Sequence, residues 1–215
     1  MTESLHTLLS RTSRNARPAM TLLPGMDLAL GRTHEICGPA RRTLAVAIAG
    51  ARPGPVIWIV PAWYPERLNG EGLTRWMDPA RIYTVTPRRE EDLLWCMEES
   101  LRSGSVPTVV AELPRPPGLT PVRRLHLAAE TGSERKDDPA HWPMGLILTA
   151  DGGSAGIETR WSLASRHSEA PRKSFGRWRI SRLRARSAPT ADWMLTAREG
   201  PDRRLSLVPL LDGLA

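Results

Sequence analysis

Apolar runs and amphipathic stretches alternate along residues 32–150, and this order predicts the main elements of the fold. Short apolar runs without a polar side are typical of strands buried on both faces, as in a parallel sheet. Such a sheet needs a crossover segment between successive strands, which is usually a helix. The strands that we expect here are Thr33–Cys37, Pro55–Val60, Arg81–Thr86, Val106–Leu113 and Gly145–Ala150.

Helical patterns fill the gaps between these strands. The clearest is Arg88–Ser103, whose apolar residues share one stripe, and Gly104 is its expected C-cap. The residues of this stripe are Leu93, Leu94, Met97 and Leu101. At the next helix, Thr120 is the expected N-cap and Pro121 the first helical residue. Thr43–Ala51 and a short stretch at Gly72–Met77 are also expected to be helical.

After residue 156 the pattern changes to strands separated by turns, without helices between them. These strands are expected at Ile157–Ser165, Gly176–Arg184, Ala191–Thr196 and Leu205–Leu210, and they are expected to extend the sheet in an antiparallel manner. We therefore predict an α/β fold with three parts. Residues 1–19 form a flexible basic arm, 20–150 the α/β core, and 151–215 a β-rich basic extension of the same domain.

The turn before the first core helix resembles a phosphate-binding loop that lacks essential residues. Such a loop has the pattern G-x-x-x-x-G-K-[ST], in which backbone N–H groups surround the phosphates and the Lys reaches them. Here four residues separate Gly38 from Thr43, where the pattern has six; the second Gly is absent, and Arg42 replaces the Lys.

This turn has two interpretations. Arg41, Arg42 and Thr43 begin a helix, and free N–H groups together with the helix dipole favour an anion there. An ordinary Arg-rich turn is the alternative. Weak ATP or ADP binding thus stays open, and it would raise the melting temperature of the protein.

Basic residues gather in the C-terminal section, and the chain carries a net charge of +7 with a pI near 10.5. Several of these basic residues recur at every second position, which in a strand would form a basic ladder on one face. The phase of this repeat changes near Ser181, where we expect a bulge or a twist, and before that point Trp178 and Ile180 would lie on the other face. Binding of phosphates or of an acidic partner is one interpretation, and an edge strand protected by charge is the other. The candidate binding residues are Arg172, Lys173, Arg177, Arg179, Arg182, Arg184 and Arg186.

Other features mainly limit the possible functions. Neither the two cysteines nor the histidines have metal-ligand spacing, and Ser165–Ser168 lacks the G-x-S-x-G pattern of a hydrolase, so we expect no metal and no catalytic residue. No apolar run is long enough for a membrane span, and we expect a cytoplasmic protein without membrane contact. The eight Trp residues are either core residues or anchors for a partner.

Several segments, taken in order and spacing, carry a resemblance to a known family. They are Leu23–Gly31, Arg32–Ala40, Pro55–Val60, Leu94–Gly104, Val109–Leu113, Arg123–Glu130, Thr159–Trp161 and Arg177–Arg179. Over about residues 20–196 the chain resembles ImuA-like proteins, which are RecA-related accessory proteins of SOS-inducible, error-prone lesion bypass in bacteria.

The resemblance implies a RecA-like fold, a mostly parallel sheet flanked by helices and extended by C-terminal antiparallel strands. It makes Gly38, Arg41, Arg42 and Thr43 a vestigial phosphate loop, and it puts Glu112 where an active ATPase has an Asp on the Mg²⁺ side. Residues 61–66 offer no clear acidic residue that would activate water. Because phosphoryl transfer needs all of these parts together, we expect no ATP hydrolysis and no cofactor.

The function implied is that of a non-catalytic accessory protein of SOS-induced error-prone translesion DNA synthesis. Its partners would be a Y-family-polymerase-like ImuB-type protein and an error-prone replicative-type DNA polymerase, with RecA and DNA as further candidates. Exposed Trp residues and the basic section would form the contact surfaces. Two alternatives stay open, a nucleotide-binding RecA-like ATPase or switch and a SulA-like cell-division inhibitor, since the SulA name is also used within this family.

Overall fold

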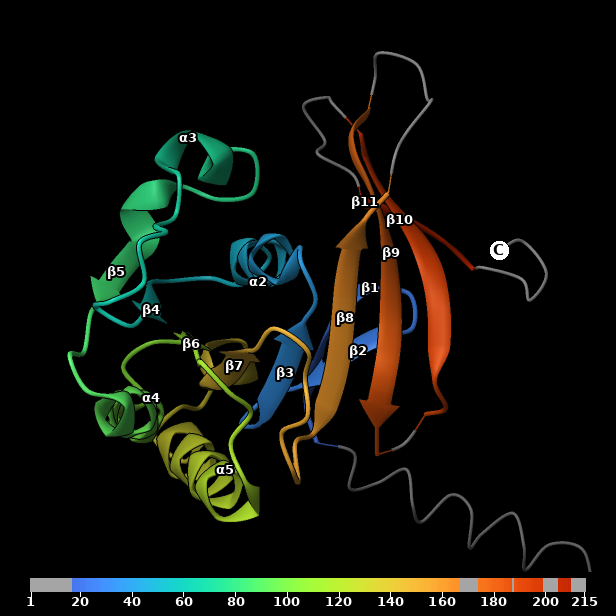
Figure 1. Cartoon of the computed structure of the whole chain (residues 1–215). Coiled ribbons are helices and arrows are strands. Elements are labelled where there is room, and N and C mark those ends of the chain that lie inside the picture. The colour runs from blue at the N-terminus through green and yellow to red at the C-terminus, as the bar shows by residue number, and fades with distance from the viewer. Residues whose placement is uncertain (1–16, 167–173, 187, 199–204, 210–215) are drawn as a thin grey trace, which may run out of the picture.

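The computed structural model describes residues 17–166, 174–186, 188–198 and 205–209. The main sheet consists of β3 (Thr33–Cys37), β4 (Val56–Ile59), β5 (Ile82–Val85), β6 (Thr108–Glu112), β7 (Met144–Leu148), β8 (Thr159–Ser165), β9 (Ser174–Ala185), β10 (Ala191–Arg198) and β11 (Leu205–Pro209). Their order across the sheet is β11-β10-β9-β8-β3-β7-β6-β4-β5. From β8 to β5 all neighbours are parallel, whereas β9, β10 and β11 pair antiparallel. The predicted α/β sheet with a C-terminal antiparallel extension is confirmed (Figure 1).

Helices cover both faces of the parallel part of the sheet. The helices are α2 (Arg41–Gly50), α3 (Gly70–Leu73), α4 (Glu90–Ser103) and α5 (Leu119–Ser133), with 3₁₀ turns at Pro79–Arg81 and Pro139–His141. In Figure 1, α2 lies on one side of the sheet, and α4 and α5 lie side by side on the other.

The predicted helix ends are partly correct. Gly104 ends α4 with φ +64°, as a left-handed C-cap should, and a Cβ there would lie 2.5 Å from the carbonyl oxygen of Gly132 in α5. Thr120 is not the N-cap of α5, because the helix already begins at Leu119 and Gly118 is the last extended residue. That N-cap prediction was wrong by two positions.

A two-stranded hairpin before the main sheet was not predicted. It consists of β1 (Ala19–Leu23) and β2 (Met26–Ala29), which pair antiparallel around Gly25 at φ +84°. Met26 and Leu28 of β2 are completely buried and belong to the same apolar cluster as Trp161 of β8. The hairpin therefore covers the sheet where the helices on that side end (Figure 1).

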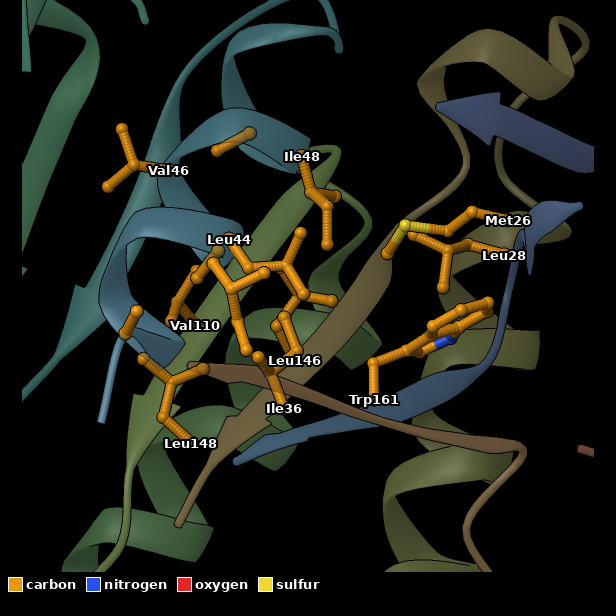
Figure 2. Packing of buried hydrophobic residues seen from close by; sticks show 14 of the residues in the cluster. Met26, Leu28, Ile36, Leu44, Val46, Ile48, Val110, Leu146, Leu148 and Trp161 are labelled. Carbon is orange, nitrogen blue, oxygen red and sulfur yellow. The ribbon is translucent and has the colours of Figure 1, made fainter. Parts of the chain in front are cut away.

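Two apolar cores lie on opposite faces of the sheet. One joins α2 and the hairpin to the sheet through residues that include Leu44, Ile36 and Trp161, and Figure 2 shows the packing of part of this cluster. The other joins α4 and α5 to the sheet through Leu93, Leu125 and their neighbours. Burial of large side chains on both faces is what the uninterrupted apolar runs predicted.

Candidate functional site

The turn from Gly38 to Arg41 is closed by hydrogen bonds within the protein. The backbone N–H of Gly38 donates to the Ala150 carbonyl at 2.8 Å, and that of Ala40 donates to the Leu163 carbonyl at 3.0 Å. The N–H of Arg41 donates back to the Gly38 carbonyl at 3.2 Å. The N–H groups of Gly38, Ala40 and Arg41, which lie where a working loop would surround a phosphate, thus already have partners.

Gly38 itself is fixed by close contacts. Its φ is +87°, and a Cβ at this position would lie 2.7 Å from the carbonyl oxygen of Leu163 and 2.9 Å from Oγ of Ser162. The glycine is therefore required for the passage from β3 into α2 past strand β8. Its presence does not depend on a phosphate ligand.

Arg42, in the position of the Lys of a phosphate loop, binds a carboxylate of the protein. Its Nη2 and Nε donate to Oε2 and Oε1 of Glu112 at 2.8 and 3.0 Å, and its Nη1 donates to Glu66 at 2.8 Å. Although burial opposes the charge of Arg42, the hydrogen bonds and charge of Glu112, with those of Glu66, raise its pKa above the ordinary value.

Glu112 stands at the end of β6 and is 2% exposed. Besides Arg42, it accepts a hydrogen bond of 2.9 Å from Nε1 of Trp58 in β4. The structure thus brings together the two sides of the predicted vestigial nucleotide site, Arg42 and Glu112, as an ion pair. Arg41 lies beside them and donates to the Gly38 carbonyl at 3.2 Å, and Thr43 follows in the first turn of α2.

Glu35, next to this turn in β3, is the acceptor of a buried hydrogen-bond network. It is completely buried and accepts hydrogen bonds from Oγ of Ser154 at 2.7 Å, Oγ1 of Thr149 at 2.9 Å and the N–H of Gly153 at 3.2 Å, while Arg160 forms an ion pair with it at 2.5 Å. Burial alone would raise its pKa, but the hydrogen bonds from Ser154, Arg160 and Thr149 outweigh burial and lower it. The carboxylate thereby fixes the connection from β7 to β8.

His34 of β3 also has a structural role. Its Nε2 lies 3.0 Å from the Ala29 carbonyl, which only accepts, so Nε2 carries the hydrogen. Its Nδ1 then accepts from the hydroxyl of Thr159 at 2.8 Å, and Thr159 in turn accepts from Nε1 of Trp161 at 3.0 Å. Burial lowers the pKa of His34 to about 4, which keeps the ring neutral.

The basic strand β9 contains the predicted bulge, but one arginine lies on the other face. In the pairing of β8 with β9, Arg160 faces Arg184 and Trp161 faces Arg182, so that Leu183 is the extra residue. Arg177 and Arg179 precede the bulge, and Arg184 follows it on the same face. Arg182 lies with Trp178 and Ile180 on the opposite face, so its assignment to the ladder was wrong.

Arg182 is half-buried between two Trp rings and the turn of the hairpin. Its guanidinium carbon lies 5.2 Å from the ring centroid of Trp193 and 5.7 Å from that of Trp161. Its Nη1 donates to the Gly25 carbonyl of the hairpin turn at 2.8 Å, and Nε donates to the Pro189 carbonyl at 2.8 Å. The physical reason is that a guanidinium can stack on aromatic rings and still satisfy its N–H groups.

The other predicted binding residues fall into three groups. Arg179 forms an ion pair with Asp192 at 2.9 Å, and Arg186 forms one with Glu158 at 3.3 Å. Arg177 and Arg184 are exposed and form no ion pair with any described residue. Arg172 and Lys173 lie outside the described residues.

The Trp residues divide between core and surface. Trp58, Trp161 and Trp178 are buried, and Trp76, Trp142 and Trp193 pack against the first core. Trp63, after β4, and Trp95, on α4, are 47% and 60% exposed. These two residues are the described Trp side chains that offer an accessible ring to a partner.

In the described part of the chain, no cluster of three or more His, Cys, Asp or Glu residues could hold a metal ion. None of the described helices is long and apolar enough to cross a membrane.

Among known proteins, no family model matches this chain, and no curated protein matches it. Among solved structures, SulA from Pseudomonas aeruginosa is similar, with 22% sequence identity and a TM-score of 0.41 over 55% of this chain and 95% of the SulA chain. At this TM-score the likeness supports no further conclusion.

Proposed function

We propose that this protein is a non-catalytic accessory protein that acts by binding other macromolecules. The observation that carries the proposal is the ion pair of Arg42 with Glu112. In a nucleotide-hydrolysing site the cation of the loop faces the phosphates, and the acidic residue opposite serves the Mg²⁺ ion. Here the two groups neutralise each other, and they leave neither charge for a nucleotide.

The closed turn supports the same proposal. A nucleotide would have to replace the hydrogen bonds from the N–H groups of Gly38 and Ala40 to carbonyl oxygens. It would also have to separate Arg42 from a buried carboxylate, which costs several kcal/mol when the carboxylate is left unpaired. These costs oppose even weak ATP or ADP binding.

The biological setting that we propose comes from the resemblance to ImuA-like proteins. The protein serves SOS-induced error-prone translesion DNA synthesis and contacts a Y-family-polymerase-like ImuB-type protein and an error-prone replicative-type polymerase. RecA is a further candidate partner. Trp63 and Trp95 are the anchors that we assign to protein contacts, because large exposed aromatic rings dominate such interfaces.

Two measurements test this proposal. Millimolar ATP or ADP with Mg²⁺ is expected to leave the melting temperature unchanged, and no phosphate release is expected; saturable stabilisation or turnover would support the ATPase or switch instead. In a pull-down from damage-treated cells, the wild type is expected to retain the ImuB-type protein and the polymerase. Trp63→Ala with Trp95→Ala is expected to lose them, whereas the matched exposed-aromatic control Tyr83→Ala retains them.

The division-inhibitor alternative has its own test. Overproduction of the protein without DNA damage is expected to leave cell length unchanged. Filamentation under these conditions, with the pull-down negative, would replace the accessory role by division inhibition.

A further inference from the structure

One face of the C-terminal strands is basic, and no described helix or strand covers it. This basic sheet face is the side of β8, β9 and β10 opposite Trp161, Trp178 and Ile180, and every described side chain on it is at least partly exposed. The opposite face is covered by the hairpin and its apolar cluster. In Figure 1 the helices α4 and α5 lie over the parallel strands and leave β9 and β10 open.

Three arginines on this face have no ion-pair partner among the described residues. Arg177 and Arg184 lie in β9, and Arg166 lies beside Arg177, because its backbone N–H donates to the Arg177 carbonyl at 2.8 Å. The neighbouring Arg160, Arg179 and Arg186 are paired with Glu35, Asp192 and Glu158. The face therefore presents an excess of positive charge at both ends of the strand.

The spacing of these charges suits a long anionic partner. Arg177 and Arg184 are separated by six strand steps once the bulge at Leu183 is allowed for, which corresponds to roughly 20 Å. Phosphates along one strand of a duplex rise by about 3.4 Å each, so this length corresponds to roughly six of them. Guanidinium groups bind phosphate oxygens in a bidentate manner.

The side chains between the arginines distinguish nucleic acid from protein. Between Arg177 and Arg184 most of them are small or polar, such as Ser162, Ala164 and Ser181. Met194, opposite Arg179, is a partly exposed apolar residue, and none of the described side chains on this face between these two arginines is aromatic. A protein partner needs aromatic or apolar anchors, and a single-stranded nucleic acid needs rings on which its bases stack. The backbone of a duplex needs neither.

We propose that the basic sheet face binds the phosphate backbone of duplex nucleic acid, independently of sequence, through Arg166, Arg177 and Arg184. The inference rests on the proposed function only in that the protein acts by binding. It assigns duplex contact to this face and leaves the protein partners to the surfaces around Trp63 and Trp95.

The test measures the affinity of the purified full-length protein for a short fluorescein-labelled DNA duplex by anisotropy at several salt concentrations. Three phosphate contacts predict that affinity falls about 40-fold between about 50 and 200 mM salt. The variant that combines Arg166→Gln, Arg177→Gln and Arg184→Gln is expected to lose the salt-dependent part of the affinity and most of the binding.

The matched control carries Arg88→Gln, Arg123→Gln and Arg135→Gln, which lowers the net charge equally at exposed positions elsewhere. It is expected to bind like the wild type, and circular dichroism checks that both variants fold. Equal loss in the two variants would mean unspecific charge attraction and would overturn the proposal. So would tighter binding of oligo-dT than of the duplex.

The result also separates this inference from the proposed function. If the basic-face variant binds duplex DNA normally but loses the ImuB-type protein in the pull-down, the face is a protein site and the inference fails while the accessory role stands. If the protein hydrolyses ATP, the proposed function fails, whatever the duplex measurement shows.

Discussion

The guanidinium of Arg182 lies over the ring of Trp193, 5.2 Å from its centroid, and also donates to the Gly25 carbonyl of the hairpin turn. One side chain thus joins β9, β10 and the β1–β2 hairpin. An arginine that looks like part of a binding surface in the sequence holds the fold together instead.

Arg182→Ala is expected to lower the free energy of unfolding by about 1–3 kcal/mol, since it removes stacking on two rings and hydrogen bonds to two carbonyls. Arg184→Ala, two positions away and exposed, is expected to change it by less than about 0.5 kcal/mol. Urea unfolding followed by Trp fluorescence measures both. Equal effects of the two substitutions would contradict the assigned role of Arg182.

Glu112→Ala is expected to destabilise the protein by about 2–4 kcal/mol, because it leaves the Arg42 cation and the Trp58 N–H without their buried partner. This expected loss of stability is smaller than for a fully buried ion pair, because the Arg42 side chain is 23% exposed and water partly screens its charge. Glu66→Ala removes the other carboxylate that binds Arg42.

Glu66 serves as the control because its side chain is 72% exposed. Its loss is expected to cost less than about 1 kcal/mol. Thermal and urea unfolding of the two variants give the comparison. An effect of Glu112→Ala as small as that of Glu66→Ala would show that the buried pair does not stabilise this edge of the sheet.

The buried His34 is expected to make the free energy of unfolding depend on pH. Its pKa is lowered by burial from 6.5 to about 4, so the unfolded chain binds the proton more readily than the folded protein does. Its contribution is therefore fully present above pH 6.5 and is lost as the pH falls toward 4, on the order of 3 kcal/mol in all. His126, whose pKa burial also lowers, acts in the same direction.

Unfolding free energies measured between pH 7.5 and 4 test this expectation, with His34→Gln as the comparison. The variant is expected to be less stable at neutral pH, and its stability is expected to depend less steeply on pH between 6.5 and 4. Parallel curves for the variant and the wild type would exclude His34 as the source.

Glu35→Ala is expected to cost more than about 3 kcal/mol, because several donors, including Arg160, lose a completely buried acceptor. Its lowered pKa also means that its stabilisation is present above pH 4.5 and is lost below it, as the carboxylate takes up a proton. Amide hydrogen exchange is expected to rise first in residues 149–156. Uniform protection of that connection in the variant would contradict the role of Glu35.

Much of the fold follows from local sequence patterns. The runs around Trp58 and Val110 have no polar side, and they form strands buried on both faces as that pattern predicts. The β1–β2 hairpin was missed because its strands have only five and four residues and their apolar positions are too few to show a period. Thr120 satisfies the usual rule for an N-cap, but the chain already turns helical after Gly118.

The candidate site was harder to predict because its contacts join distant segments. The pattern around Gly38 indicated a degenerate loop, but it could not show that Arg42 binds Glu112, 70 residues further along the chain. Likewise, the neighbouring sequence does not show that Arg182 and Arg184 lie on opposite faces of the strand. Only the pairing of β9 with β8 and the rings of Trp161 and Trp193 decide which arginine turns inward.

The bulge in β9 has a consequence for which changes this chain tolerates. Leu183 is 44% exposed and is the residue that the facing strand does not match. Many side chains would therefore be accepted at position 183, and even its deletion would leave Arg182 opposite Trp161 and Arg184 opposite Arg160. If Leu183 instead entered the regular ladder, it would face Arg160, and Arg184 and Arg186 would turn toward the hairpin. The bulge, rather than the identity of the amino acid that forms it, therefore keeps Arg184 and Arg186 on the basic sheet face.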